Sequence, residues 1–345
     1  MSRASSRPEA AGEPAPAPAT PSFEAVVVRQ DARGCVARID GAEELWCSVR
    51  GKVHLEGSVT ATATVAVGDR VAVRRGQDGK GAIECIRPRR SVLSRPDPHQ
   101  DRLQHVLAAN VDQVVIATSA ADPAFAPGFV DRVLVVAAWS RLACVLVVNK
   151  MDLAPGLPPE AEVYRRLGVT VVATSVQSGE GIDELRRILT GKVSAITGHS
   201  GVGKSSLLNA VEPDLGLVVG RVNEVSGRGR QTTTAAKMVH LVSTGAAGGS
   251  VIDTPGIREF GLFNLPRREL PWLFPDLAAV APGCRFPDCL HRGEPGCAVP
   301  AAILAGTVAP WRHESYLRML ESLSDHKPWE MKRSEGARPP RGVDD

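Results

Sequence analysis

A glycine-rich segment in the middle of the chain has the residue spacing of a phosphate-binding loop. Residues Gly198–Ser206 read GHSGVGKSS, with both glycines of that pattern in place before Lys204 and Ser205. Glycines let backbone N–H groups turn toward phosphate oxygens, and the start of a helix adds partial positive charge. Lys204 would reach the β- and γ-phosphates as a catalytic residue, and the Ser205 hydroxyl would hold Mg²⁺. We predict a nucleotide-binding loop with these members: Gly198, His199, Ser200, Gly201, Val202, Gly203, Lys204, Ser205 and Ser206.

A second motif could recognise guanine. The apolar run Cys144–Val148 (CVLVV) ends directly before the residues NKMD. The carboxylate of Asp152 can accept two N–H groups on one edge of guanine, whereas adenine would leave these groups unpaired. In isolation such a tetrapeptide is more often a helix cap, but the preceding strand and the phosphate loop favour base recognition. The residues Thr174–Val176 (TSV) end the next expected strand and could close over the base. The predicted base-binding residues are Asn149, Lys150, Asp152, Ser175 and Val176.

Two further segments could hold Mg²⁺ and sense the γ-phosphate. The residues DTPG follow the strand-like run Ser250–Ile252, so Asp253 could belong to the Mg²⁺ shell and the Gly256 N–H could contact the γ-phosphate. The alternative for this motif is a type I turn after a strand. The segment Ser226–Thr234 (SGRGRQTTT) is glycine-rich and basic, and a bound triphosphate could order it. We select Thr233 as the threonine that completes the Mg²⁺ coordination.

Three cysteines and a histidine form a compact group near the C-terminus. Cys284, Cys289, His291 and Cys297 lie in a loop that contains Gly and Pro. Three thiolates and an imidazole suit tetrahedral Zn²⁺ and leave no position open for a substrate, so the metal would be structural. The alternative is a set of reduced cysteines without a metal, but the histidine inside the group favours zinc.

The composition is that of a soluble globular protein. The chain has 345 residues, of which 43% are hydrophobic and 23% charged, and its net charge of +3 does not by itself indicate a polyanionic partner. Its seven cysteines show no disulfide framework, which fits a reduced compartment. No apolar run approaches the roughly 20 residues of a membrane helix. The N-terminus lacks an apolar h-region, so we expect no secretory signal. We expect a cytoplasmic protein without a membrane partner.

The first part of the chain predicts a small β-barrel. After Met1–Pro21, a Pro- and Ala-rich tail expected to be disordered, short alternating runs follow one another with turns between them. About five strands in about seventy residues suit an OB-type barrel, a fold often used on oligonucleotides. Several arginines give basic spots, although a solvated face explains them equally well: Arg74, Arg75, Arg87, Arg89 and Arg90. The expected strands are Ala25–Arg29, Gly34–Ile39, Glu44–Val49, Ser58–Ala63, Arg70–Arg74 and Gly81–Ile86.

Beyond a connecting segment, Ser91–Asn110, apolar strands alternate with helical patterns. This alternation predicts a parallel sheet that is covered on both faces, with ligands at the carboxyl ends of the strands. The expected strands are Val114–Thr118, Cys144–Val148, Val169–Ala173, Lys192–Thr197, Lys237–Leu241 and Ser250–Ile252, and the expected helices are Pro127–Trp139, Ala161–Leu167, Ile182–Leu189 and Ser205–Val211. After the metal-binding loop, Ala301–Leu304 and Tyr316–Leu323 are also expected to be helical.

The order of the motifs is distinctive, because the base-recognition motif precedes the phosphate loop. A sheet of this kind can be circularly permuted if its ends lie close together. From about Phe23 to about Leu323 the chain resembles the circularly permuted, ribosome small-subunit-dependent GTPase A family (RsgA, also called YjeQ). The resemblance implies a multidomain fold: a tail over residues 1–21, an OB-type β-barrel over 22–92, a circularly permuted P-loop α/β GTPase domain over 93–265, a mostly helical zinc-binding domain over 266–330 and a basic mobile tail over 331–345.

The resemblance also implies a function. Members of the family are late assembly factors that bind the small ribosomal subunit and its rRNA, hydrolyse GTP there and leave. GTP or GDP, Mg²⁺ and one structural Zn²⁺ would be the cofactors, and we expect a monomer. The alternative is a non-catalytic RNA-binding scaffold that GTP merely stabilises.

The chain departs from a common GTPase pattern at the water-orienting position. Ile257 follows DTPG, where signalling GTPases usually carry Gln. Many members of the resembled family carry His just before the switch threonines, and this chain has Gln231 there. A Gln amide can orient a water molecule but cannot act as a general base. We predict that Gln231 positions the attacking water; the alternative is a solvent-exposed or RNA-contacting side chain.

Overall fold

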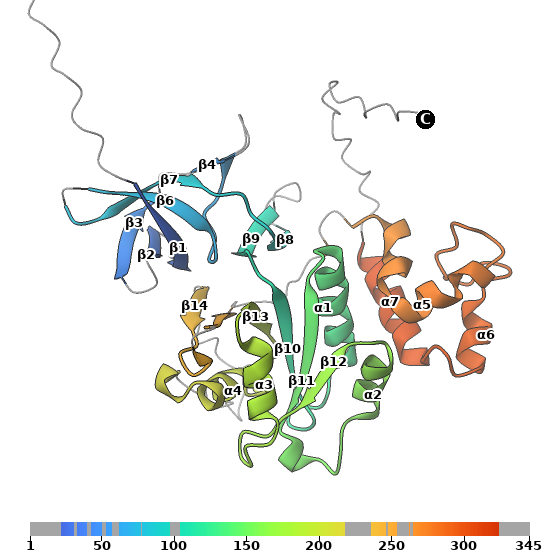
Figure 1. Cartoon of the computed structure of the whole chain (residues 1–345). Helices are drawn as coiled ribbons and strands as arrows, with labels where there is room; N and C mark the ends of the chain where they lie inside the picture. The colour runs from blue at the N-terminus through green and yellow to red at the C-terminus, as the bar shows by residue number, and fades with distance from the viewer. Residues whose placement is uncertain are drawn as a thin grey trace, which may run out of the picture.

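The computed structural model shows a β-barrel, an α/β part with a large sheet and a group of C-terminal helices, in that order along the chain (Figure 1). It describes residues 22–30, 33–39, 43–49, 53–56, 62–76, 78–96, 104–217, 236–245, 248–253, 262 and 265–323. Both predicted tails lie outside these residues, as do four residues singled out in the sequence: Gln231, Thr233, Gly256 and Ile257.

Five strands of the N-terminal part close into a ring: β1 (Ser22–Gln30), β2 (Gly34–Ile39), β3 (Glu43–Ser48), β6 (Arg70–Arg75) and β7 (Gly81–Ile86). Strand β1 pairs with β2 and β6, β2 pairs with β3, and β7 pairs with β3 and β6; the β3–β7 pair is parallel and the others are antiparallel. Alternate side chains such as Val27 and Val71 point inward and are fully buried. The predicted five-stranded barrel is confirmed.

Two short strands extend the barrel beyond the predicted set. Strand β4 (Val53–Leu55) pairs with β7, and β5 (Thr62–Ala63) pairs with β4. The expected strand Ser58–Ala63 is described only in its last two residues, as β5. Strand β4 was missed because three residues carry too little alternation to be recognised.

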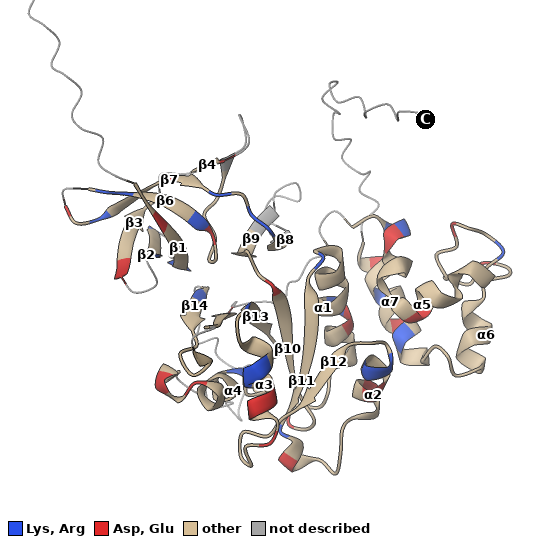
Figure 2. Cartoon of the chain, in the orientation of Figure 1, with Lys and Arg blue, Asp and Glu red and all other residues tan. Residues whose placement is uncertain are grey.

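The arginines that the sequence marks as basic spots all pair with carboxylates, and Figure 2 shows the two signs of charge interspersed over the barrel. Such pairs leave little unbalanced positive charge at the barrel surface, so these arginines by themselves do not make an RNA-binding patch. The pairs are Arg74–Glu84 at 3.1 Å, Arg75–Glu43 at 2.5 Å, Arg87 with Glu24 and, at 2.8 Å, with Glu56, Arg89–Asp69 at 2.7 Å and Arg90–Asp112 at 3.4 Å.

The segment Ser91–Asn110 is a β-hairpin rather than a plain connector. Strand β8 (Val92–Pro96) pairs with β9 (Gln104–Ala109), with a register shift after Leu93 that hides the alternation in the sequence. The hairpin is joined to the barrel through Asn110, whose side-chain amide donates to the carbonyl of Gly68 at 2.9 Å. Leu93 is fully buried, and it belongs to the same core cluster as Val114 and Ile116 of the α/β part. The hairpin therefore packs the barrel against the sheet.

Six strands form the α/β sheet in the order β12-β11-β10-β13-β15-β14. Their bounds are β10 (Gln113–Ser119), β11 (Ala143–Asn149), β12 (Thr170–Ala173), β13 (Val193–Thr197), β14 (Lys237–His240) and β15 (Ser250–Asp253). The first five in this order are parallel, and β14 is antiparallel to β15. The chain builds outward from β10 to β12 and then returns to the other side of β10 with β13. Ligands bind at such a reversal, outside the carboxyl ends of the two central strands.

Helices cover both faces of this sheet: α1 (Pro127–Trp139), α2 (Pro159–Arg166), α3 (Ile182–Leu189) and α4 (Lys204–Val211). Along β10, Val114 and Ile116 belong to one core cluster, which includes residues of α1 and α2. Val115 and Ala117 face the other cluster, together with residues of α3 and α4. The continuous apolar run of β10 is thus explained by burial on both sides, as the sequence predicts.

The C-terminal part is helical and is packed on α1 (Figure 1). It contains a 3-10 segment, η5 (Arg267–Leu273), and the helices α5 (Pro275–Val280), α6 (Val299–Leu304) and α7 (Pro310–Ser322). The expected helix Tyr316–Leu323 is the second half of α7, which begins at Pro310, an ordinary first residue of a helix. No helix among the described residues combines the length and apolar character that a membrane span needs.

A buried ion-pair network joins α7 to α1. The guanidinium of Arg312, 2% exposed, donates to Asp276 at 2.7 and 2.9 Å and to Asp131 of α1. Tyr164 of α2 donates to the same Asp131 carboxylate at 2.6 Å. Removing one partner of a buried pair costs about 3–5 kcal/mol, because a buried charge is left uncompensated. Asp131 and Arg312 therefore hold the C-terminal helices in a defined position on the sheet part.

Candidate nucleotide site and metal centre

The predicted phosphate loop connects the end of β13 to the first residue of α4, Lys204. Gly203 has φ +92°, and a Cβ there would lie 2.5 Å from the side-chain nitrogen of Asn149. A Cβ at Gly198 would collide with the carbonyl oxygen of Ala117 on β10. The Lys204 ammonium lies over the loop and donates to the carbonyls of Gly198 at 2.8 Å and His199 at 3.0 Å. The loop therefore has the strand–loop–helix setting that the motif requires.

The first residue of the NKMD motif links the end of β11 to the phosphate loop and to the residue that follows β12. Asn149, the last residue of β11, is buried, and its amide donates to the carbonyl of Val202 in the phosphate loop at 2.9 Å. Its side-chain oxygen accepts from the hydroxyl of Thr174, after β12, at 3.2 Å. The base motif and the phosphate loop are thus adjacent, as a single nucleotide spanning both would need. A direct contact between Asn149 and the base stays a prediction.

The other predicted base-binding residues lie together at the same edge. Asp152 is exposed at the surface and accepts a hydrogen bond from the Ser175 hydroxyl at 2.6 Å. Lys150 has φ +60° and donates to the carbonyl of Asp122. Val176, next to Ser175, is 36% exposed. An exposed carboxylate and a partly exposed apolar side chain thus lie close together along this edge, and these are the groups that recognition of a flat, hydrogen-bonding base requires.

Asp253 ends β15, directly beside the strand that leads into the phosphate loop, since its register partner is Ile196 of β13. Burial raises the pKa of the Asp253 carboxyl, and the positive charge of Lys204 acts in the opposite direction. Lys204, the first residue of α4, is thus a positive charge that acts on this carboxyl. A joint role of Asp253 and Ser205 in holding Mg²⁺ stays a prediction. The donor set of a carboxylate and a hydroxyl suits Mg²⁺.

One contact of the loop has no signal in the sequence. The ring of His199 lies against Phe129 of α1, with 4.4 Å between the ring centroids. Phe129 reads in the sequence as one more apolar residue of a helix, so neither its spacing nor its type distinguishes it. Helix α1 therefore touches the phosphate loop at one point and the C-terminal helices at another, Asp131.

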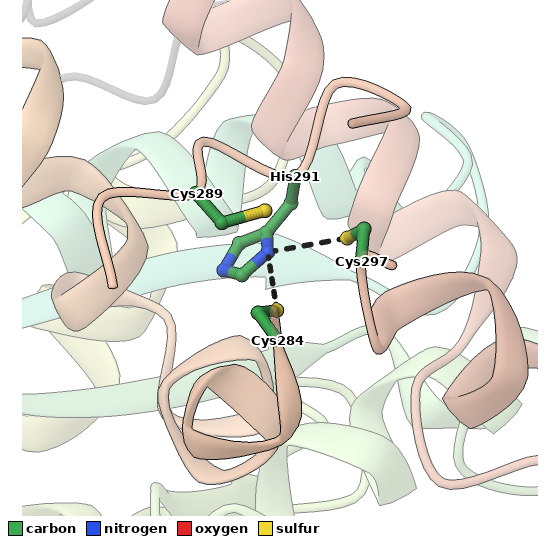
Figure 3. Close-up of side chains that lie close together, drawn as sticks. All are labelled: Cys284, Cys289, His291 and Cys297. Atoms are coloured by element: carbon green, nitrogen blue, oxygen red, sulfur yellow. Dashed lines mark hydrogen bonds between the residues drawn. The ribbon is translucent and has the colours of Figure 1, made fainter. Parts of the chain in front are cut away.

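The four predicted metal ligands converge (Figure 3). Their ligand atoms all lie within 4.8 Å of one another. The Nδ1 atom of His291 is 3.6 Å from the sulfur of Cys284 and 3.5 Å from that of Cys297. Tetrahedral zinc, with bonds of about 2.3 Å to sulfur and about 2.0 Å to nitrogen, requires a nitrogen–sulfur separation of about 3.5 Å. Burial lowers the pKa of His291, which favours the neutral imidazole that ligates metals. The residues therefore fit a structural zinc ion.

Neighbouring groups hold the metal-binding loop in place. Tyr316 of α7 donates to the carbonyl of Leu290 at 2.7 Å, and a ring nitrogen of His313 lies 2.8 Å from the carbonyl of His291. The carboxylate of Glu294 accepts from the backbone N–H groups of Leu290 and Arg292 at 3.0 and 2.7 Å. Such outer contacts orient metal ligands, and only the ligands themselves have a recognisable spacing in the sequence.

Comparison with known proteins gives consistent matches. A sequence model of the family described as RsgA GTPase matches residues 86–263. The Small ribosomal subunit biogenesis GTPase RsgA of Shewanella oneidensis is 37% identical over 287 residues, which are 80% of this chain and 78% of the relative. The protein of the same name from Moorella thermoacetica is 39% identical over 287 residues, 82% and 91% of the two chains.

Two solved structures have the same arrangement of elements. The crystal structure of YjeQ from Thermotoga maritima superposes with a TM-score of 0.63 at 30% identity and covers 88% of this chain and 98% of that one. YloQ, described as a circularly permuted GTPase, superposes with a TM-score of 0.62 at 26% identity and covers 89% and 96%. With a match to half of the sequence and relatives similar over most of it, this chain belongs to the RsgA GTPase family.

Proposed function

We propose that this protein is a Mg²⁺-dependent GTPase that acts in the biogenesis of the small ribosomal subunit. The observation that carries the proposal is the 2.9 Å contact between Asn149 and Val202, because it brings the guanine motif and the phosphate loop into one site at the reversal point of the sheet. Its relatives are named for that role. The protein would work in the cytoplasm as a monomer that binds rRNA and is released when GTP is hydrolysed.

The residues of the site have separate roles in this proposal. Lys204 contacts the β- and γ-phosphates, while Ser205, Thr233 and Asp253 hold Mg²⁺. The N–H of Gly256 senses the γ-phosphate, and Gln231 orients the attacking water. Mg²⁺, when bound, neutralises the charge that develops on the phosphates. The other loop and base-motif residues bind the nucleotide, and one structural zinc ion holds the loop of Cys284, Cys289, His291 and Cys297. We also propose the domain limits expected from the sequence: the barrel over residues 22–92, the GTPase domain over 93–265 and the zinc-binding domain over 266–330.

The direct test is GTP hydrolysis by the purified protein with and without small ribosomal subunits. We expect the subunits to raise the turnover rate strongly, because an assembly factor must hydrolyse GTP on its particle rather than in free solution. Tight binding to the subunit with no gain in turnover would contradict this proposal and favour the non-catalytic scaffold.

Asp152→Asn is expected to lower the affinity for GTP by about 100-fold. The carboxylate would accept two N–H groups of guanine, and hydrogen bonds to charged groups contribute about 1.5–3 kcal/mol each. The amide replaces one acceptor by a donor, which then faces the amino group of the base. Xanthine carries a carbonyl in place of that amino group, so affinity for xanthosine triphosphate should rise in the same variant. Titration with fluorescent analogues of both nucleotides measures the switch.

The control is Asp183→Asn, an exposed carboxylate on α3 that forms a surface ion pair with Arg186. It should bind both nucleotides as the unmodified protein does. A variant at Asp152 that loses affinity for both nucleotides alike would show a general disturbance of the site and would remove the assignment of Asp152 to base recognition.

A further inference from the structure

An exposed aromatic side chain stands on the loop that carries the metal ligands. Phe286 lies between Cys284 and Cys289 and is 41% exposed, in a chain with only 4% aromatic residues. The guanidinium of Arg285 lies over its ring, 5.4 Å from the ring centroid. Aromatic rings and arginine planes are the surfaces on which unpaired nucleobases stack.

The backbone of the loop fixes the arginine of this pair in advance. Gly296 has φ +78°, and a Cβ there would lie 2.8 Å from the Cβ of Arg285 and 3.4 Å from its Cδ. The arginine stem therefore lies against a backbone that has no side chain. The Arg285 N–H also donates to the carbonyl of Gly296 at 3.0 Å. Arg285 directly follows the ligand Cys284, and Gly296 directly precedes the ligand Cys297. The backbone on both sides of this contact is therefore held, and Arg285 loses little freedom when it binds a partner.

The charges around Phe286 are also suited to a nucleic acid. Three residues of the loop are both charged and exposed: Arg285, Asp288 and Arg292. Among the described residues, no carboxylate forms an ion pair with either arginine. The carboxylate of Glu294 is turned inward to the loop backbone. The barrel arginines, by contrast, are paired with carboxylates. Arg285 and Arg292 can therefore bind a phosphate without first breaking an ion pair.

We propose that Arg285 and Phe286 form a stacking platform for an unpaired base of rRNA, and that Arg292 contacts a phosphate of the same strand. This inference rests on the proposed function and gives it a specific contact point. Stacking needs only the π-face of a base, so the platform reads the single-stranded state rather than a sequence. The zinc ion would then have a role in RNA binding, since it holds the platform rigid.

Phe286→Leu is expected to weaken binding to the small ribosomal subunit by about 5- to 150-fold, which corresponds to the loss of one stacked base. Phe286→Trp should bind as tightly as the unmodified protein or more tightly, because it keeps an aromatic face. The matched control is Leu304→Ala on α6, which removes an apolar side chain, 90% exposed, from the same helical part and should not change the affinity. Each variant is first checked for one bound zinc ion per chain, and the dissociation constants are measured at two salt concentrations.

Unchanged affinity in Phe286→Leu with zinc retained would overturn the platform. Equal losses in Phe286→Leu and Phe286→Trp would also overturn it, because stacking predicts that tryptophan preserves binding. A photoreactive phenylalanine analogue at position 286 identifies the partner: crosslinks to rRNA support the inference, and crosslinks only to a ribosomal protein contradict it. The unmodified protein is assayed for stimulated GTP hydrolysis in parallel. Absent stimulation counts against the proposed function, whereas normal stimulation with unchanged Phe286→Leu binding counts against the platform alone.

Discussion

Lys204→Ala is expected to lower the subunit-stimulated rate of GTP hydrolysis by about 100- to 1,000-fold, the usual effect of removing one group that stabilises transition-state charge. The Lys204 ammonium already lies over the phosphate loop, 2.8 Å from the carbonyl oxygen of Gly198. The substitution has a second consequence. The positive charge of Lys204 opposes the rise that burial causes in the pKa of Asp253, so its loss raises this pKa further. More of the carboxyl is then protonated at a given pH, and the affinity for Mg²⁺ should fall as well.

Two further variants make this result specific. Lys204→Arg keeps the charge but not the compact ammonium, so it should recover only part of the activity. Lys192→Ala removes a lysine just before β13, at the opposite end of the same strand, where its ammonium bonds the side chain of Gln113 at 3.1 Å. We expect this control to hydrolyse GTP at the normal rate. Single-turnover rates at saturating GTP measure all three variants, and a Lys204→Ala rate above a tenth of normal would remove the lysine from the catalytic machinery.

The sequence predicts those parts of the molecule whose structure depends on residues close together in the chain. Strand β10 is recognisable because residues that face both core clusters must all be apolar, and the phosphate loop because Gly198 and Gly203 leave no room for a side chain. The barrel, the permuted order and the family follow from such signals and are confirmed. The roles of the individual nucleotide-site residues stay predictions.

What the sequence does not reveal depends on which distant residues meet. Nothing local shows that Asn149 bonds the carbonyl of Val202, or that Phe129 touches His199. The hairpin β8–β9 was missed because a register shift interrupts its alternation. The barrel arginines give basic spots in the sequence because their carboxylate partners lie at least ten residues away along the chain. Long-range pairing decides both the packing and the electrostatics in these cases.

Helix α1 connects the phosphate loop with the C-terminal helices. Its residue Phe129 lies against the phosphate loop, and Asp131, about half a turn further on, holds Arg312 of α7. Arg312 lies on α7, and Tyr316, about one turn further along the same helix, donates a hydrogen bond to the carbonyl of Leu290 in the metal-binding loop. A short series of direct contacts therefore runs from the nucleotide loop to the loop with the metal ligands. Each link is a named side-chain contact, so each can be removed separately by substitution.

Cys297→Ser is expected to weaken zinc binding by about 100- to 1,000-fold. Structural zinc sites bind with apparent free energies of about 10–16 kcal/mol, so one of four ligands contributes about 2.5–4 kcal/mol. The loop that loses zinc also loses its cross-link, and its contacts with Tyr316 and His313 then have to hold it alone. We therefore expect a lower unfolding temperature for the C-terminal helices and weaker binding to the small subunit. Affinity for GTP should stay unchanged, because the nucleotide site lies on the sheet part.

The control for this substitution is Cys85→Ser on β7, a cysteine of the barrel that lies apart from the metal ligands. It should keep one zinc ion per chain, measured with a chromophoric chelator after the protein is unfolded. If Cys297→Ser binds zinc as tightly as Cys85→Ser, the group of three cysteines and a histidine is not a zinc site. If it loses zinc yet binds the subunit normally, the metal serves the fold only, and the stacking platform does not depend on it. Loss of both zinc and subunit binding, with GTP affinity retained, would tie RNA recognition to the cross-link that holds Arg285 and Phe286 in place.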